Sequence, residues 1–150
     1  PFILPRFKYP DKKFCLLAKK NGIPILRIKD INSKYSKREI SKYDCDLLVS
    51  MSYNQIIGLD LQKKFSRGII NCHAGKLPLY RGRSVLNWVL INGEKEFGIT
   101  VHKIDDGIDT GDILSQKVFK IKNADNYHTL LEKSYVEAPK ILYSSIIKIA

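Results

Sequence analysis

Blocks of apolar and polar positions follow one another along the chain, and each block predicts an element. Apolar side chains at helical spacing predict a helix over residues 11–20, which Asn21-Gly22 ends. Residues 23–28 are typical of a short strand. The polar, lysine-rich stretch 29–42 predicts a loop with a surface helix.

Two compact apolar runs, residues 46–50 and 69–73, are typical of buried parallel strands. Residues 54–65 lie between them and carry apolar side chains that predict a short helix. A strand, a helix and a strand of this combined length form a βαβ unit, in which the two strands are parallel.

The second half of the chain continues the α/β pattern. It predicts a helix over residues 84–91, strands over 97–102 and 113–121, and a terminal helix over 125–150. Ser84 can cap the first of these helices, and Pro139 should kink or divide the last. The whole is expected to be an open α/β domain, with function at the carboxyl ends of its strands.

Two loops that follow predicted strands carry the candidate chemistry. Asn71 and His73 are two residues apart on a strand, so their side chains leave the same face. The loop 74–83 has two glycines, one proline and three cations. Asp109 lies in a second loop, 105–111, between glycines.

These residue types suit acyl transfer. An imidazole transfers protons near neutral pH, an amide donates to a developing oxyanion, and a carboxylate fixes the imidazole. Cys72 should face the opposite side of its strand and belong to the core, so no nucleophilic side chain is predicted. Taken singly, a histidine at a strand end and an aspartate in a glycine-rich turn are more often structural. The same structural interpretation is preferred for His102 and His128.

Composition adds limits to this picture. The 150 residues suffice for one domain, and a net charge of +11 is compatible with nucleic acid, an anionic small substrate or a merely lysine-rich surface. Three cysteines without a CxxC pair predict no disulfide framework and fit a reducing cytoplasm. No metal site is expected, because no cluster has ligand spacing, and no apolar run is long enough to predict a membrane partner.

The segments 71–82 (Asn-Cys-His-Ala-Gly-Lys-Leu-Pro-Leu-Tyr-Arg-Gly) and 105–113 (Asp-Asp-Gly-Ile-Asp-Thr-Gly-Asp-Ile) resemble the signature of the folate-dependent formyltransferases. The resemblance covers about residues 44–121. It implies a Rossmann-like, three-layer α/β domain with a mostly parallel sheet, and 10-formyltetrahydrofolate as the formyl donor. It places the catalytic triad of the family on Asn71, His73 and Asp109.

The resemblance also implies binding residues. The folate pocket would be lined, largely through backbone groups, by Tyr53, Asn54, Gln55, Ile57, Asp105, Asp106, Gly107 and Ile108. The run from His73 to Arg83, with Asn87-Trp88, is most similar to the nucleotide-sugar branch of the family. In that branch Lys76, Tyr80, Arg81 and Arg83 would meet the substrate, because a cluster of cations suits a diphosphate.

The expected function is transfer of a formyl group to the amine of a nucleotide-linked amino sugar, for lipopolysaccharide synthesis. Asn71 and His73 would stabilise the oxyanion, while His73 and Asp109 handle protons. One alternative is methionyl-tRNA formyltransferase, and another is a truncated, non-catalytic remnant that binds folate or a sugar nucleotide. The domain of the family begins with a strand, a helix and a strand ahead of Pro1 and continues into a C-terminal extension, so residues 1–150 are expected to be an incomplete catalytic core. A homodimer is compatible with the family.

Overall fold

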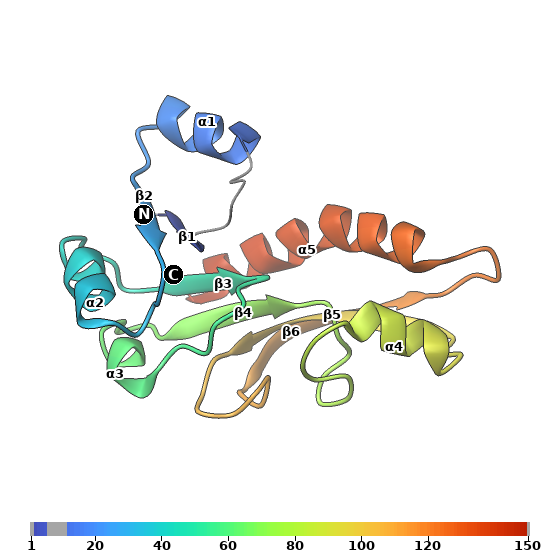
Figure 1. The fold of residues 1–150 in the computed structure, drawn as a ribbon. Coiled ribbons are helices and arrows are strands. Elements are labelled where there is room, and N and C mark those ends of the chain that lie inside the picture. Colours follow the sequence, from blue (N-terminus) through green and yellow to red (C-terminus); the bar gives the residue numbers. More distant parts are fainter. Residues whose placement is uncertain (1, 6–11, 150) are drawn as a thin grey trace.

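Four neighbouring strands form the main sheet in the computed structural model, which describes residues 2–5 and 12–149 (Figure 1). They lie in chain order: β3 (Leu48–Met51), β4 (Ile69–His73), β5 (Glu96–Lys103) and β6 (Ile113–Lys120). β3 and β4 are parallel, whereas β4 with β5 and β5 with β6 are antiparallel. The predicted α/β fold is confirmed, but the sheet is mixed rather than mostly parallel. The turn between β5 and β6 is too short for the crossover that a parallel pair needs.

A second, two-stranded sheet forms near the N-terminus. β1 (Phe2–Pro5) and β2 (Ile25–Ile28) are parallel, and α1 (Lys12–Lys20) lies between them in the chain. The helix and β2 confirm the predicted elements to within two residues. β1 was not predicted, because a four-residue strand that ends in proline carries no periodic pattern of its own.

Two short helices flank β3. α2 (Lys34–Ser41) confirms the predicted surface helix, and α3 (Leu59–Gln62) is much shorter than the helix predicted over 54–65. The reason lies in Asn32, whose side-chain amide donates to the Ile56 carbonyl (2.9 Å) and accepts from the Gly58 amide (2.7 Å). These bonds hold the backbone ahead of α3 in an irregular loop, which lines the cavity described below.

The remaining helices are α4 (Val85–Ile91) and α5 (Tyr127–Ile149). Ser84 precedes α4, but it is left-handed (φ 56°) and its side chain makes no capping hydrogen bond, so the predicted cap is wrong. α5 passes through Pro139 without being divided. Pro139 is exposed, and water on that side can replace the backbone hydrogen bond that proline removes. No helix in the described part of the chain has the length and apolarity of a membrane span.

The main core lies between the sheet and α5, which runs along one face of it (Figure 1). Phe97, Ile99 and Val101 of β5 are fully buried there and pack with α4 and α5. The polar residues that alternate with them are buried too, with Thr100 at 0% and His102 at 1% exposure. Buried polar side chains need hydrogen-bond partners, and both residues find theirs at the candidate site.

Phe97 is the largest fully buried side chain and stacks on Phe119 at 5.3 Å between ring centroids. Phe97→Ala should lower the free energy of unfolding by about 3–5 kcal/mol, because it leaves a cavity in the core. Leu79→Ala, at a position that is 61% exposed, should change it by less than about 0.5 kcal/mol. Urea titrations of both variants check this, and equal losses would contradict the core assignment.

Candidate active site

A cavity of about 840 Å³ opens at the carboxyl ends of β3 and β4, within the usual size range of ligand pockets. Three loops line it: the loop that follows β3, the loop between β4 and α4, and the loop between β5 and β6. Tyr127, at the start of α5, completes the wall. The cavity therefore lies where the sequence predicted function, at the ends of the strands.

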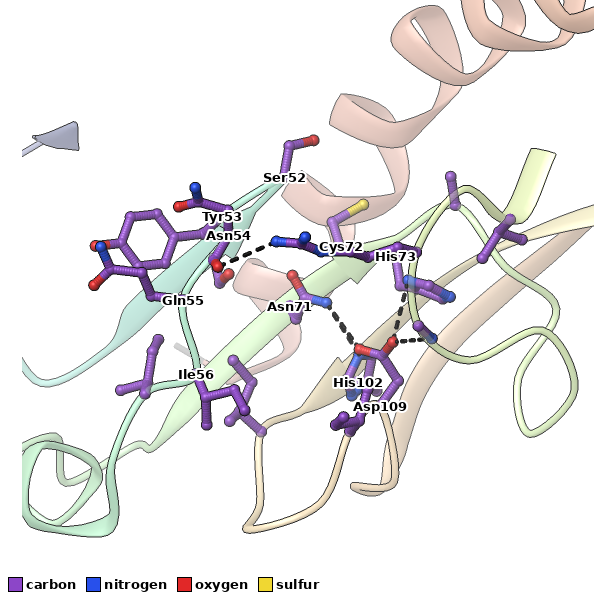
Figure 2. A pocket seen from close by; sticks show the side chains of 18 of the residues that line it. Ser52, Tyr53, Asn54, Gln55, Ile56, Asn71, Cys72, His73, His102 and Asp109 are labelled. Carbon is purple, nitrogen blue, oxygen red and sulfur yellow. Dashed lines mark hydrogen bonds and ion pairs between the residues drawn. The ribbon is translucent and has the colours of Figure 1, made fainter. Parts of the chain in front are cut away.

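Asp109 is the point on which the polar side chains of the cavity converge (Figure 2). Its Oδ2 lies 3.6 Å from Nδ1 of His73 and accepts a hydrogen bond from the Gly82 amide at 2.9 Å. Its Oδ1 lies 3.4 Å from Nε2 of His102 and accepts from the Asn71 side-chain amide, also at 3.4 Å. The structure thus brings the three predicted catalytic residues together and adds a second histidine.

The register of the sheet explains why His102 is there. In the antiparallel pairing of β4 with β5, Asn71 lies opposite His102 and His73 lies opposite Thr100. All four side chains occur at every second position, so they share one face. His102, for which the sequence favoured a structural role, therefore lies beside the predicted catalytic residues. The sequence shows only that His102 lies two residues after Thr100 and so faces the same side of the strand. That spacing is informative only once the pairing of β4 with β5 is known.

Cys72, between Asn71 and His73, belongs to the core cluster as predicted. Burial raises the pKa of its thiol to about 11. The thiol therefore stays protonated at neutral pH and is a poor nucleophile.

Each of the two imidazoles is held by a backbone carbonyl on one side and by Asp109 on the other. Nε2 of His73 lies 2.7 Å from the Tyr80 carbonyl oxygen, and Nδ1 of His102 lies 2.7 Å from the Lys103 carbonyl oxygen. A carbonyl oxygen only accepts, so both of these ring nitrogens carry a proton. The opposite nitrogen of each ring faces the Asp109 carboxylate, and Nε2 of His102 also lies 3.3 Å from the side-chain nitrogen of Asn71.

The charge of Asp109 is fixed by the same contacts. Burial raises the pKa of the carboxyl group, but three other effects outweigh it. These are the hydrogen bond from His102, the hydrogen bond from the Gly82 amide and the charges of both imidazoles, and together they lower the pKa from 3.8 to about 2. Asp109 is therefore a permanent carboxylate at neutral pH, suited to holding and orienting the two imidazoles.

The loop that follows β3 forms the wall opposite Asp109 (Figure 2). Gln55 fixes it, because its side-chain amide donates to the Lys29 carbonyl (2.7 Å) and accepts from the Ile31 amide (2.8 Å). The Tyr53 hydroxyl is buried and has no hydrogen-bond partner among the described residues. Burial, with a smaller contribution from the charge of Asp30, raises the pKa of Tyr53.

Most of the residues predicted to bind a folate line this cavity. Those that do are Tyr53, Asn54, Gln55, Ile57, Asp105, Gly107 and Ile108. Asp106 is exposed and does not line it. The loop from 105 to 109 is held by Asp105, whose carboxylate accepts from the Thr110 hydroxyl (2.5 Å) and the Gly107 amide (3.1 Å).

Of the four residues predicted to meet an anionic substrate, the structure brings only Arg83 to the cavity. Its guanidinium donates to the Asn54 carbonyl at 3.3 Å. Lys76 instead pairs with Glu96, and the Tyr80 hydroxyl donates to Glu94. Arg81 is exposed and does not line the cavity. Two acidic residues, Glu94 ahead of β5 and Glu96 at its start, thus draw two of the predicted side chains away from the site.

No three side chains of the His, Cys, Asp or Glu types are grouped to hold a metal ion in residues 2–5 and 12–149.

An α/β domain with an amide, two imidazoles and a carboxylate at the ends of its strands defines a class of acyl-transfer domain. The chain belongs to the formyl transferase family, whose sequence profile matches residues 10–146. This membership confirms the resemblance that the two sequence motifs carry.

Two relatives illustrate the range of the family. The chain is 42% identical over 114 residues to the bifunctional polymyxin resistance protein ArnA of Wigglesworthia glossinidia brevipalpis, covering 76% of this chain and 17% of that protein. It is 34% identical over 127 residues to the methionyl-tRNA formyltransferase of Thermodesulfovibrio yellowstonii, covering 85% of this chain and 41% of that protein. The chain therefore spans less than half the length of these relatives.

Solved structures share the fold. Phosphoribosylglycinamide formyltransferase from Bacillus halodurans superposes with a TM-score of 0.85 at 24% identity, covering 98% of this chain and 78% of that one. A second structure is that of the formyltransferase PseJ from Anoxybacillus kamchatkensis in complex with UDP-4,6-dideoxy-4-formamido-L-AltNAc and tetrahydrofolate. It superposes with a TM-score of 0.74 at 24% identity, covering 99% of this chain and 75% of that one. At these identities the likeness shows the fold alone.

The lowered pKa of Asp109 predicts an acid-sensitive contribution to stability. Because the pKa is lower in the folded than in the unfolded chain, the stabilisation is present above about pH 4 and is lost as the pH falls through about 2. Urea titrations between pH 5 and pH 2 should show the wild type losing roughly 1–2 kcal/mol more than Asp109→Asn. Asp106→Asn, on the same exposed turn, is the matched control and should follow the wild type. Parallel curves for the wild type and Asp109→Asn would contradict the assignment.

Proposed function

We propose that this chain carries the catalytic centre of an enzyme that transfers a formyl group from 10-formyltetrahydrofolate to the amine of a nucleotide-linked amino sugar. The observation that carries the proposal is the convergence of Asn71, His73 and His102 on the Asp109 carboxylate inside a cavity of ligand size. Within residues 12–149, no serine or cysteine is a hydrogen-bond partner of His73. This supports direct transfer to an external amine rather than a covalent enzyme intermediate.

The side chains divide the chemistry between them. The folate supplies an activated formyl group. The Asn71 amide and the Nε2–H of His73, which the Tyr80 carbonyl accepts in this structure, are the donors proposed for the formyl oxygen as negative charge develops on it. Overall the amine loses a proton and the leaving nitrogen gains one. Asp109, paired with both imidazoles, orients His73 and lies in position to pass that proton, directly or through water.

The donor side of the cavity is formed by the loop after β3 and the loop from 105 to 109. The backbone groups of these loops suit the polar edge of a pterin. The similarity to PseJ, whose structure contains tetrahydrofolate, supports this ligand.

The acceptor is proposed from Arg83 and from two similar proteins. Arg83 is the cation that lines the cavity, and a guanidinium binds phosphate oxygens in two-pronged geometry. PseJ is described with a UDP-linked formamido sugar, and ArnA is the relative with 42% identity. A nucleotide sugar offers the diphosphate that Arg83 needs and the amine that the chemistry needs. We propose synthesis of surface polysaccharide such as lipopolysaccharide as its setting.

A second candidate acceptor is methionyl-tRNA, favoured by the relatives of that name and by the net charge of +11. The two candidates differ in their dependence on salt. Binding of tRNA releases many counterions and weakens steeply as salt rises, whereas binding of a nucleotide sugar changes little.

Replacing His73 or Asp109 with Asn should lower kcat by about 10²–10⁴-fold, because each change removes a group that acts on the transition state. The assay follows formyl transfer from 10-formyltetrahydrofolate to a UDP-linked 4-amino sugar. His128→Asn is the matched control, since His128 is exposed and its ring pairs with Glu132 across 3.3 Å. Circular dichroism of every variant should match the wild type. Near-normal turnover in either site variant would refute the assignment.

Arg83→Ala should raise KM for the nucleotide sugar about tenfold and leave kcat within about threefold, because it removes a charge-assisted contact to the diphosphate. Arg81→Ala, on the same loop but outside the cavity, should leave both constants near those of the wild type. Equal effects of the two substitutions would show that Arg83 acts only through general surface charge.

A further inference from the structure

The loop between β4 and α4, residues 74–84, is fastened to the sheet by a side chain outside the proposed chemistry. Thr100 on β5 is fully buried, and its hydroxyl donates to the Gly75 carbonyl at 2.6 Å. The same oxygen accepts from the Leu77 amide at 3.4 Å. One hydroxyl therefore holds two successive backbone groups at the start of the loop.

Gln116 on β6 completes this fastening. Its side-chain amide donates to the Leu77 carbonyl and to the Thr100 hydroxyl, both at 2.8 Å. In the register of the sheet, Gln116 lies opposite Thr100, and Thr100 lies opposite His73. The three side chains thus form one row across three strands, with the catalytic imidazole at one end and Gln116 at the other.

The far end of the loop touches both partners of the catalytic pair. The Tyr80 carbonyl accepts from Nε2 of His73 (2.7 Å), and the Gly82 amide donates to Oδ2 of Asp109 (2.9 Å). A shift of the loop therefore moves one hydrogen-bond partner of the imidazole and one of the carboxylate together.

The loop also packs with no spare room. A Cβ added at Gly75 would lie 2.3 Å from Nε2 of His73 and 2.5 Å from the Tyr80 carbonyl oxygen. A Cβ added at Gly98 on β5 would lie 2.8 Å from Cα of Lys76. The loop backbone therefore packs closely against His73 on one side and against β5 on the other. A small shift of the loop would displace the His73 imidazole.

We infer that Thr100 and Gln116 are positioning residues for formyl transfer: they set the loop that orients His73 toward Asp109. This inference rests on the proposed function. Both side chains act through the loop backbone rather than on the substrate, so their loss should lower kcat and leave substrate binding little changed. Displacing a reacting group by about 1 Å costs on the order of 10²-fold in rate.

The test compares Thr100→Val and Gln116→Leu, which remove the hydrogen bonds at similar size, with Thr100→Ser, which keeps the hydroxyl. Ser145→Ala is the matched control. Ser145 is as buried as Thr100, and its hydroxyl bonds the Ile141 carbonyl (2.8 Å) and the Ser115 hydroxyl. Ser115 and Gln116 are consecutive on a strand, so this pair lies on the other face of the sheet.

Thr100→Val and Gln116→Leu should each lower kcat by about 10- to 100-fold, with KM for both substrates within about threefold. Thr100→Ser should restore most of the rate, and Ser145→Ala should keep the kcat of the wild type despite a comparable loss in melting temperature. If kcat in Thr100→Val and Gln116→Leu falls no further than in Ser145→Ala, the inference is overturned. Gln116, at the solvent-exposed edge, provides the decisive variant if Thr100→Val does not fold.

A second readout needs no turnover and separates this inference from the proposed function. Nitrogen-15 NMR of the histidine rings should show the His73 Nε2 signal displaced in Thr100→Val and Gln116→Leu, while the His102 signals stay in place. An unmoved His73 signal would overturn the positioning role. A wild type that transfers formyl to neither a nucleotide sugar nor methionyl-tRNA would refute the proposed function, and the ring signals would still decide this inference.

Discussion

One half-buried carboxylate, that of Asp109, organises the site. Two imidazoles, one side-chain amide and one backbone amide surround it, contributed by β4, β5 and the loop that follows β4. A carboxylate in such a place is stable only while these donors are present, since burial alone disfavours its charge. The lowered pKa of Asp109 records that the donors outweigh the burial. The charge of Asp109 therefore depends on the loops and strands that hold its hydrogen-bond donors in place.

The mixed sheet makes this convergence possible. β4 and β5 are antiparallel, and their register places Asn71 opposite His102, the last residue but one of β5. Asn71 and His102 become cross-strand neighbours, and the turn after β5 returns Asp109 toward both. β5 is buried on both faces, so its polar residues have to find partners inside the protein. Thr100 finds them in the loop that carries Tyr80, and His102 finds them at Asp109.

Much of the fold could be predicted from the sequence, because the apolar runs at β4 and β5 and the spacing in α1 and α5 are long enough to show their period. β1 and the true extent of α3 could not, since pairing and the hydrogen bonds of Asn32 decide them. The grouping of Asn71, His73 and Asp109 followed from two motifs. The place of His102 in the site depends on the register of β4 with β5, and the direction of the Lys76 side chain depends on its pairing with Glu96. No local sequence pattern reveals either of these.

The most direct test of the account follows the formyl carbon itself. Wild type and Asp109→Asn are incubated with 10-formyltetrahydrofolate labelled with carbon-13 in the formyl group and with a UDP-linked 4-amino sugar, and the product is observed by NMR. The account predicts that a formamide carbon signal grows with the wild type and not with the variant. A signal that grows equally with both would contradict the central role of Asp109.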